Sequence, residues 1–338
     1  MKVLVTGHNG YIGAHLVELL KKHEHQVTGV DINIFEGCEW ETLTAPDTEL
    51  IKDIRDLTKQ DLAGHDCVMH LAAISNDPMG DLDPALTYSI NREGSINLAQ
   101  LTKDAGVPRF LFSSSCSLYG KGDNMDLDEN AQLNPLSTYA ESKVATERAL
   151  SKMADENFCP VYLRNSTAYG HSPMLRIDLV VNNLLASALS FGEIRIMSDG
   201  TPWRPLVHCR DIARAFVALL DAPREKVFNE AINIGGNEEN YQVKDVVSLV
   251  QKVLPECKAV FTGEVGQDPR DYRVNFDKLN RLLPNFKLEY TVEKGINELY
   301  KKYIKFNFSE KDFNGSQFVR LRVVKKKLAA LVNSGRIS

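Results

Sequence analysis

Short runs of β-branched and other apolar residues alternate with longer stretches of helical periodicity through the first half of the chain. This alternation is typical of a parallel β-sheet covered by α-helices, because each strand needs a crossover before the next one. The predicted strands are 2–6, 26–31, 49–52, 67–71, 109–113 and 161–164. The predicted helices are 12–22, 84–105 and a stretch after Thr138, which we expect to act as an N-cap.

The second half of the chain is less regular and predicts a smaller α/β lobe. A helix at 211–220 and a strand at 231–234 are expected to return to the first sheet, so the two lobes are interleaved. The lobe itself is predicted from a helix at 178–190, a strand at 193–197 and helices at 243–253 and 292–305. The resulting division is 1–168 plus about 205–235, then about 169–204 plus 236–305, then a tail at 306–338.

The tail is basic and contains a predicted amphipathic helix. From residue 301 onward it has ten Lys or Arg residues and two acidic residues, whereas the whole chain has a net charge of −5. One face of the helix is formed by Leu321, Val324, Leu328 and Leu331. Docking on the acidic body or on a partner subunit is the favoured interpretation, and binding to RNA or an anionic surface is the alternative.

Composition places the chain among ordinary globular proteins. Its 338 residues suffice for one large domain or two that share an interface, and 43% are apolar. We expect no membrane association, because no apolar run reaches the ~18 residues of a spanning helix. The N-terminus lacks the pattern of a signal peptide, so we expect a cytoplasmic protein. The net charge gives no general attraction to nucleic acid, and none is predicted as a partner.

The six cysteines predict neither a disulfide framework nor a zinc site, because they lie far apart and form no Cys-x-x-Cys pair. Most are expected to be buried as small hydrophobic residues. The histidines at 8, 15, 23 and 25 also have no companions at metal-ligand spacing, so no metal is predicted.

A glycine-rich turn follows the first predicted strand and opens the first helix. Gly7, Gly10 and Gly13, with Tyr11 and Ile12 between the last two, are spaced as G-x-x-G-x-x-G. Such a turn lets backbone N–H groups approach a pyrophosphate, whose charge the helix N-terminus also favours. The sequence therefore predicts a dinucleotide site here.

Acidic and small residues follow the next strands. Asp31 ends the second strand, where a carboxylate holds both ribose hydroxyls and repels a 2′-phosphate, which favours NAD over NADP. A turn-forming aspartate is the alternative. Asp53 and Ile54 follow the third strand and are expected to meet the adenine ring. The small residues after the fourth strand, expected where backbone passes close to a cofactor, are Leu71, Ala72 and Ala73.

Tyr139 and Lys143 lie four residues apart and therefore share one face of the predicted helix. A phenol with an unperturbed pKa near 10 is a poor base at neutral pH, so a nearby ammonium is needed to favour the phenolate. Lys143 supplies that charge. The pair indicates an acid/base unit beside the cofactor.

The chain resembles the extended branch of the short-chain dehydrogenase/reductase superfamily, the nucleotide-sugar epimerases, dehydratases and reductases. The resemblance covers about residues 1–300. The motifs that carry it, in order, are Thr6-Gly7-x-x-Gly10-x-x-Gly13, Asp31, Leu71-Ala72-Ala73, Asn91, 112–120 with Ser-Ser-Ser-Cys-Ser-Leu-Tyr-Gly, Tyr139-x-x-x-Lys143 and Leu163-Arg164. It implies a Rossmann-type doubly wound parallel sheet, NAD as cofactor, and a smaller α/β lobe for a nucleoside-diphosphate sugar.

The resemblance also implies roles for individual residues. Tyr139 exchanges a proton with a sugar hydroxyl, Lys143 also holds the nicotinamide ribose, and Ser115 hydrogen-bonds the sugar oxygen. Asn91 is carried over as a cofactor-site residue. Dehydratases of the family carry acidic residues where this chain has Cys116 and Ser117, which disfavours dehydration and decarboxylation. Cys116 is a substrate-site candidate, as an acid or, preferably, as a packed thiol.

The substrate lobe is predicted to hold a diphosphate, which planar arginine groups suit. By resemblance Arg204 and Arg270 bind it, and Asn182 and Asn183 contact diphosphate or base. Surface ion pairs are the alternative for both arginines. Relatives usually have an asparagine where this chain has Thr167, and the asparagine is displaced to Asn165; both are substrate-site candidates.

The favoured function is NAD-dependent epimerisation or oxidoreduction of a nucleoside-diphosphate sugar, most simply at C4. The alternative is a reductase that uses NAD(P)H on a 4-keto-6-deoxy sugar nucleotide, and a more distant one is a non-catalytic dinucleotide sensor. By resemblance a homodimer is expected through the helices before Ala105 and after Tyr139.

Overall fold

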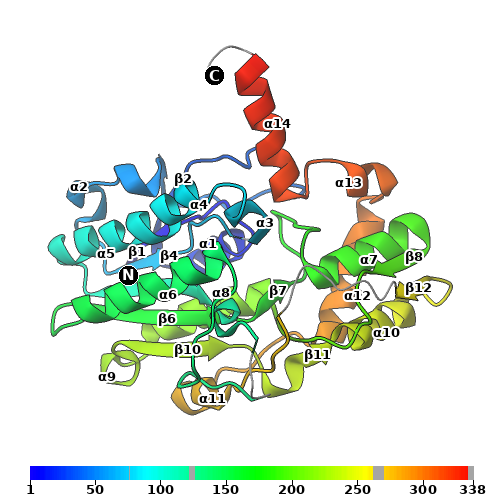
Figure 1. Ribbon diagram of the computed structural model, residues 1–338. Helices are drawn as coiled ribbons and strands as arrows, with labels where there is room; N and C mark the ends of the chain where they lie inside the picture. Colours follow the sequence, from blue (N-terminus) through cyan, green and yellow to red (C-terminus); the bar gives the residue numbers. More distant parts are fainter. Residues whose placement is uncertain (76, 122–125, 262–269, 334–338) are drawn as a thin grey trace.

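A seven-stranded parallel sheet forms the centre of the computed structural model, which describes residues 1–338 except 76, 122–125, 262–269 and 334–338 (Figure 1). The strands lie in the order β10-β6-β5-β4-β1-β2-β3. Their bounds are β1 Lys2–Thr6, β2 Gln26–Asp31, β3 Thr48–Ile51, β4 Cys67–His70, β5 Arg109–Ser115, β6 Cys159–Asn165 and β10 Glu230–Ile234. The predicted α/β doubly wound parallel sheet is confirmed.

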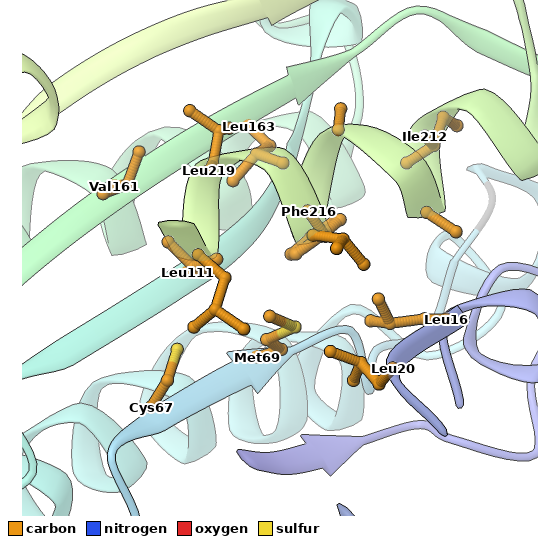
Figure 2. Packing of buried hydrophobic residues seen from close by; sticks show 14 of the residues in the cluster. Leu16, Leu20, Cys67, Met69, Leu111, Val161, Leu163, Ile212, Phe216 and Leu219 are labelled. Atoms are coloured by element: carbon orange, nitrogen blue, oxygen red, sulfur yellow. The ribbon is translucent and has the colours of Figure 1, made fainter. Parts of the chain in front are cut away.

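Apolar side chains leave both faces of this sheet because successive residues of a strand point to opposite sides. In β1, Val3 and Val5 belong to the core under α1 (Gly13–Lys22) and α8 (Cys209–Asp221). Leu4 belongs to the core under α5 (Ser95–Asp104) and α6 (Thr138–Met153). Figure 2 shows Phe216 of α8 pointing into the same space as Leu111 of β5 and Leu16 of α1. Burial on both faces explains why these strands are nearly continuous apolar runs.

Helices cover both faces of the sheet. One face carries α1 Gly13–Lys22, α8 Cys209–Asp221 and α11 Asp277–Leu282. The other carries α2 Lys59–Leu62, α5 Ser95–Asp104 and α6 Thr138–Met153. The shorter helices are α3 Asp77–Gly80, α4 Pro84–Thr87, α9 Arg224–Val227 and the 3₁₀ segments Ile54–Asp56, Cys116–Tyr119 and Asn237–Glu239.

Two helical predictions differ in detail from the structure. The stretch predicted as one helix at 84–105 is interrupted by a π-helix, Tyr88–Gly94, between α4 and α5. The N-cap of α6 is Ser137 and not Thr138, because the Ser137 hydroxyl accepts a hydrogen bond from Ala140 N at 3.2 Å. Ser137 has extended backbone angles, which a cap needs, and Thr138 is already helical.

The second lobe packs around its own apolar cluster. Its helices are α7 Val180–Phe191, α10 Val243–Val253 and α12 Val292–Lys305. Its strands are β7 Thr167–Tyr169, β9 Trp203–His208 and β11 Asn240–Gln242 in one sheet, and β8 Glu193–Ile196 and β12 Lys258–Phe261 in another. The short strands β7, β9, β11 and β12 were not predicted.

The tail forms α13 Glu310–Asn314 and α14 Arg320–Asn333, and α14 extends away from the rest of the molecule toward its C-terminal end (Figure 1). Phe308 and Phe318 are buried in the core of the second lobe. In α14 the predicted face is only partly right: Leu321 is half-buried, while Arg320 and Val323 are buried. A backbone hydrogen bond from Ile177 N to Phe318 O at 2.9 Å fixes how the chain enters the helix.

Leu328 and Leu331 lie outside the residues whose side chains are described. Within the described chain, no helix is long and apolar enough to cross a membrane.

Candidate active site

The strand order reverses between β1 and β4, and the loops that follow these two strands meet at the carboxyl edge of the sheet. Such a switch point is where doubly wound sheets bind ligands. Gly7 has φ +72°, and a Cβ there would lie 2.8 Å from Ala72 N. The Thr6 hydroxyl accepts hydrogen bonds from Leu71 N and Ala72 N, both at 3.2 Å. These contacts bring the two loops together.

The glycine turn is too tight for side chains. Gly10 N donates to Gly7 O at 3.0 Å, and a Cβ at Gly13 would overlap that same carbonyl oxygen. Helix α1 begins at Gly13, with Ile12 as its half-buried N-cap. The turn therefore fits a pyrophosphate held by backbone N–H groups at a helix N-terminus.

Tyr11, predicted as a cofactor residue, is buried and its side chain connects the two lobes. Its hydroxyl donates to Gly170 O at 2.6 Å and accepts from Asn182 Nδ2 at 3.1 Å. Burial raises the pKa of this phenol well above its usual value. Only the Tyr11 backbone is left to meet a cofactor.

Asp31 lies at the end of β2, where its carboxylate accepts from Asn9 N at 3.2 Å and Asn33 N at 3.0 Å. The first of these contacts joins the strand end to the glycine turn. The half-buried carboxylate is thus held at the end of the second strand, beside the glycine turn.

Asp53 caps the 3₁₀ segment Ile54–Asp56 and is paired with Arg55, whose Nη2 lies 2.7 Å from Asp53 Oδ2. This hydrogen bond to Arg55 lowers the pKa of Asp53. Ile54 is buried. An adenine amine would therefore have to share the Asp53 carboxylate with Arg55.

Asn91 is wholly buried in the π-helix and holds the loop after β4. Its Oδ1 accepts from Ile74 N at 2.8 Å and its Nδ2 donates to Ile74 O at 2.9 Å. Thr146 of α6 donates to Asn91 O at 3.1 Å. In this structure Asn91 holds the loop after β4 at Ile74 and connects it to α6.

Tyr139 and Lys143 occupy one face of α6 beside the end of β5. The Lys143 Nζ atom is 5.6 Å from the centre of the Tyr139 ring and donates to Ser113 O at 2.7 Å. The side chain is buried, and burial lowers the pKa of Lys143 to about 7 against the opposing effect of Glu147. The predicted pairing of phenol and amine is thus present in the fold.

Ser115 is the last residue of β5 and is half-buried. Its hydroxyl accepts from Ser117 N at 3.1 Å. Because Lys143 binds the carbonyl of Ser113 on the same strand end, the structure gathers Ser115, Tyr139 and Lys143 at one edge.

A buried polar network that the sequence did not reveal supports this edge. Arg164 of β6 pairs with Glu147 of α6 at 2.7 Å, and both side chains are 7% exposed. His70 bridges the Thr6 and Ser95 hydroxyls at 2.7 Å each. Burial, with a contribution from Lys143, lowers the pKa of His70 to about 3, so it is neutral. These groups connect strands to helices and carry no distinctive spacing.

Cys116 is wholly buried and its thiol donates to Arg164 O at 3.1 Å. It packs in a cluster that includes Leu118, Tyr119 and Val144. Burial raises the pKa of the thiol far above its usual value. The position favours the packed thiol over a substrate contact.

The two candidates on β6 and β7 differ in exposure. Asn165 is buried and donates to the Ser113 hydroxyl at 3.0 Å, with its Oδ1 unpaired among the described residues. Thr167 begins β7 and is half-buried.

The side chains of Asn182 and Asn183 form hydrogen bonds with the backbone of the loop that connects β7 to α7. Asn182 is wholly buried, accepts from Gly170 N at 2.8 Å and donates to Arg176 O at 2.7 Å. Its amide is used within the protein, so its place is a positioning one and not the predicted substrate contact. Asn183, which is half-buried, donates to Ile177 O at 3.0 Å.

Arg204 and Arg270 come together although 66 positions separate them. The Arg204 guanidinium donates to the carbonyl oxygen of Arg270 and to that of Trp203. Asp271 accepts from Trp203 N at 2.8 Å and fastens the two segments. The Arg204 side chain and the backbone of Arg270 therefore lie together in the second lobe.

Sequence reasoning missed Arg176, which is buried and close enough to Tyr139 to interact with it electrostatically. It binds Asp178 at 2.9 Å and the Ser75 hydroxyl at 3.1 Å. Burial opposes its charge, but Asp178, Tyr11 and Tyr139 raise its pKa. The signal in the sequence was an Arg-x-Asp triplet at the start of the helix predicted for 178–190, and such triplets are too common to indicate a site. Among the described residues, no group of three or more potential metal ligands is found.

The fold and this edge define a dinucleotide-binding α/β protein of the Rossmann type. Comparison with family models identifies the group: residues 3–235 match the NAD dependent epimerase/dehydratase family. The chain belongs to this family. The predicted resemblance, the prediction of an enzyme and that of NAD as cofactor are confirmed.

Three relatives are 25% to 29% identical to this chain. The chain is 29% identical over 306 residues to an uncharacterized UDP-glucose epimerase, YtcB, of Bacillus subtilis (strain 168), covering 84% of this chain and 92% of the relative. Two solved structures each match 90% of this chain. The NAD-dependent NDP-hexosamine 5,6-dehydratase TunA has a TM-score of 0.80 at 25% identity and 98% coverage of that chain. UDP-glucuronic acid 4-epimerase of Bacillus cereus, bound to UDP-glucuronic acid and NAD, has a TM-score of 0.76 at 27% identity, and the match covers 99% of that chain.

Proposed function

We propose that the chain is an NAD-dependent epimerase that inverts C4 of a nucleoside-diphosphate hexose, with UDP-glucose as the first substrate to test. The observation that carries the proposal is the Tyr139 and Lys143 pair at the end of β5, one strand away from the loop after β4 that contacts the glycine turn. The relatives named above as epimerases favour a UDP-sugar over other nucleotides.

Each catalytic residue has a chemical task in this proposal. Tyr139 takes the proton of the C4 hydroxyl and later returns it to the 4-keto sugar, while Ser115 hydrogen-bonds the same oxygen. Lys143 stabilises the phenolate by its charge. NAD, when bound, supplies a hydride acceptor and donor for C4. Inversion requires the keto sugar to turn and present its other face.

The substrate diphosphate is assigned to Arg204 and Arg270, whose segments meet in the second lobe. Guanidinium groups suit a diphosphate because they donate parallel hydrogen bonds. Arg176 is close enough to Tyr139 to influence its charge and is assigned to the sugar end. Asp31 is assigned to the adenosine ribose.

Epimerisation is favoured over dehydration because the positions beside Ser115 offer no acid. Cys116 is buried with its thiol bonded to Arg164 O, and Ser117 is buried as well. Elimination of water requires a second acid or base close to the sugar. Because a dehydratase, TunA, is among the similar structures, the reaction products should be tested for dehydration as well as for epimerisation.

The test is to purify the protein, identify bound nucleotide by mass spectrometry, and incubate it with UDP-hexoses while following NADH absorbance and product stereochemistry. We expect interconversion of C4 epimers without net change in NADH. Stoichiometric NADH consumption by a 4-keto-6-deoxy sugar nucleotide would instead identify a reductase. An unsaturated product would identify a dehydratase, and the absence of turnover with every sugar would contradict the proposal.

A further inference from the structure

The tail places a buried arginine at the cofactor edge, outside the residues 3–235 that match the family model. Arg320 is the first residue of α14 and is 2% exposed. Its guanidinium lies over the Phe35 ring at 4.4 Å, and its Nη2 donates to Met174 O at 3.0 Å. Its Nη1 is buried and has no hydrogen-bond partner among the described residues.

The surroundings of Arg320 belong to the glycine-turn side of the molecule. One turn further along α14, Val323 packs with Ala14, Cys38 and Met174. Ala14 is the second residue of α1, so this small cluster covers the first turn of the helix that follows the glycine turn. The loop after β2 is tied to the same segment, because Gln317 donates to Glu39 O at 3.4 Å.

Burial and the Arg176 charge outweigh the charges of Asp178 and Asp31, which raise the pKa of Arg320. Within the described chain, no carboxylate lies within ion-pair distance of its guanidinium. The nearby Asp178 is bonded to Arg176, and Asp31 accepts from two backbone N–H groups. Burial and the Arg176 charge lower the pKa of Arg320 to about 10, so it remains charged at neutral pH. A buried charge without a partner is costly, and an anionic ligand removes that cost.

We propose that Arg320 binds a phosphate of the NAD pyrophosphate, reaching it from the C-terminal segment that crosses the cofactor edge. The assignment rests on the proposed cofactor site at the glycine turn. The pyrophosphate is favoured over a 2′-phosphate because Asp31 would repel the latter. It is favoured over the sugar-nucleotide diphosphate because that group is assigned to Arg204 and Arg270, whose segments meet in the second lobe.

The test compares full-length wild type with Arg320→Met and Arg320→Lys. The matched control is Arg322→Met, since Arg322 lies on the same helix, is exposed and bonds only to carbonyl oxygens of Phe313 and Gly315 among the described residues. Calorimetry on cofactor-stripped protein measures the affinities for NAD⁺, ADP, adenosine and UDP. Thermal melting reports whether each variant is folded.

We expect Arg320→Met to weaken NAD⁺ and ADP binding by about 10-fold or more, as removal of one charge-assisted hydrogen bond implies. Adenosine, which has no phosphate, and UDP should bind as in wild type, and Arg322→Met should change nothing. Arg320→Lys keeps the charge and stem but not the planar group, so a several-fold loss for NAD⁺ is expected. It serves as the test if Arg320→Met does not fold.

Three results would overturn the assignment. Unchanged NAD⁺ affinity in the folded variants would make Arg320 structural, as would an equal loss for adenosine. A loss confined to UDP would move Arg320 to the substrate diphosphate. Wild-type protein that binds NAD⁺ but epimerises no sugar would refute the proposed function and leave this inference standing.

Discussion

At the scale of the residue, Lys143 combines a chemical task with a cost in stability. Its amine is buried, and its pKa is lowered from 10.5 to about 7. Below pH 7 the folded protein must therefore bury an ammonium, whereas the unfolded chain keeps this lysine protonated up to about pH 10.5. Since the unfolded state binds more protons between these values, the contribution of Lys143 to stability rises with pH from 7 to 10.5.

Lys143→Met should therefore be more thermostable than wild type near neutral pH while losing activity. The gain in Tm is expected to be largest at pH 6 and to shrink toward pH 9.5, because only the wild type carries the buried charge. Calorimetric melting at several pH values measures this. A difference in Tm that is the same at pH 6 and pH 9.5 would mean that Lys143 is not titrating as described.

Tyr139→Phe should lower kcat by about 10²- to 10⁴-fold, the range for loss of a positioned acid/base group. NAD⁺ affinity and Tm should change little, because the half-buried ring is retained. Tyr88→Phe is the control. The Tyr88 hydroxyl donates to Glu141, which lies on the surface of α6, the helix that carries Tyr139. The kcat of Tyr88→Phe should match that of wild type. Wild-type turnover by Tyr139→Phe would refute the mechanism.

At the scale of the element, the glycine turn is the most constrained piece of backbone. Gly13→Ala should abolish NAD⁺ retention, because the added methyl overlaps Gly7 O at the start of α1. Gly64→Ala is the comparison, since nothing lies within 4 Å of a Cβ there and only its φ of +79° is unfavourable. The Gly64→Ala variant should be about 1 kcal/mol less stable than wild type and should retain its bound NAD⁺. The nucleotide released on denaturing each purified protein is measured by absorbance and mass spectrometry. Equal NAD content in both variants would contradict the steric argument.

The π-helix is an element that pattern could not predict. Residues 84–105 have one continuous helical pattern, yet the widened turn Tyr88–Gly94 places the Asn91 amide against the backbone of Ile74. Such turns are common at functional sites. Here the π-helix lets the Asn91 side chain form hydrogen bonds with the loop after β4.

At the scale of the whole molecule, Trp40 connects parts that are distant in sequence. The indole stacks on Phe306 of the tail at 4.7 Å and donates to Ser172 O at 2.7 Å. The loop after β2, the loop after β7 and the tail are therefore fastened together. This arrangement keeps Arg320 beside the cofactor edge.

The family resemblance predicts a homodimer whose interface is formed by α5 and α6. Light scattering after size exclusion should give twice the 37.8 kDa chain mass. Ala149→Arg should halve it, because Ala149 lies partly exposed on α6 where a bulky charge would separate two copies. Asn297→Arg, exposed on α12, is the control and should leave the mass unchanged. A monomeric wild type would refute the dimer.

The sequence alone determined the parallel sheet, the glycine turn and the Tyr139/Lys143 pair. These depend on local periodicity and on spacing within one strand–turn–helix unit or one helix, so neighbouring residues suffice to specify them. The tertiary structure decided what depends on residues far apart in the chain. It buried Asn182 and Cys116, joined Arg204 to the Arg270 segment, and turned α14 so that Arg320 and Val323 face inward. The phase of a docked helix and the partners of a buried polar group are set by packing against distant elements, which no local pattern records.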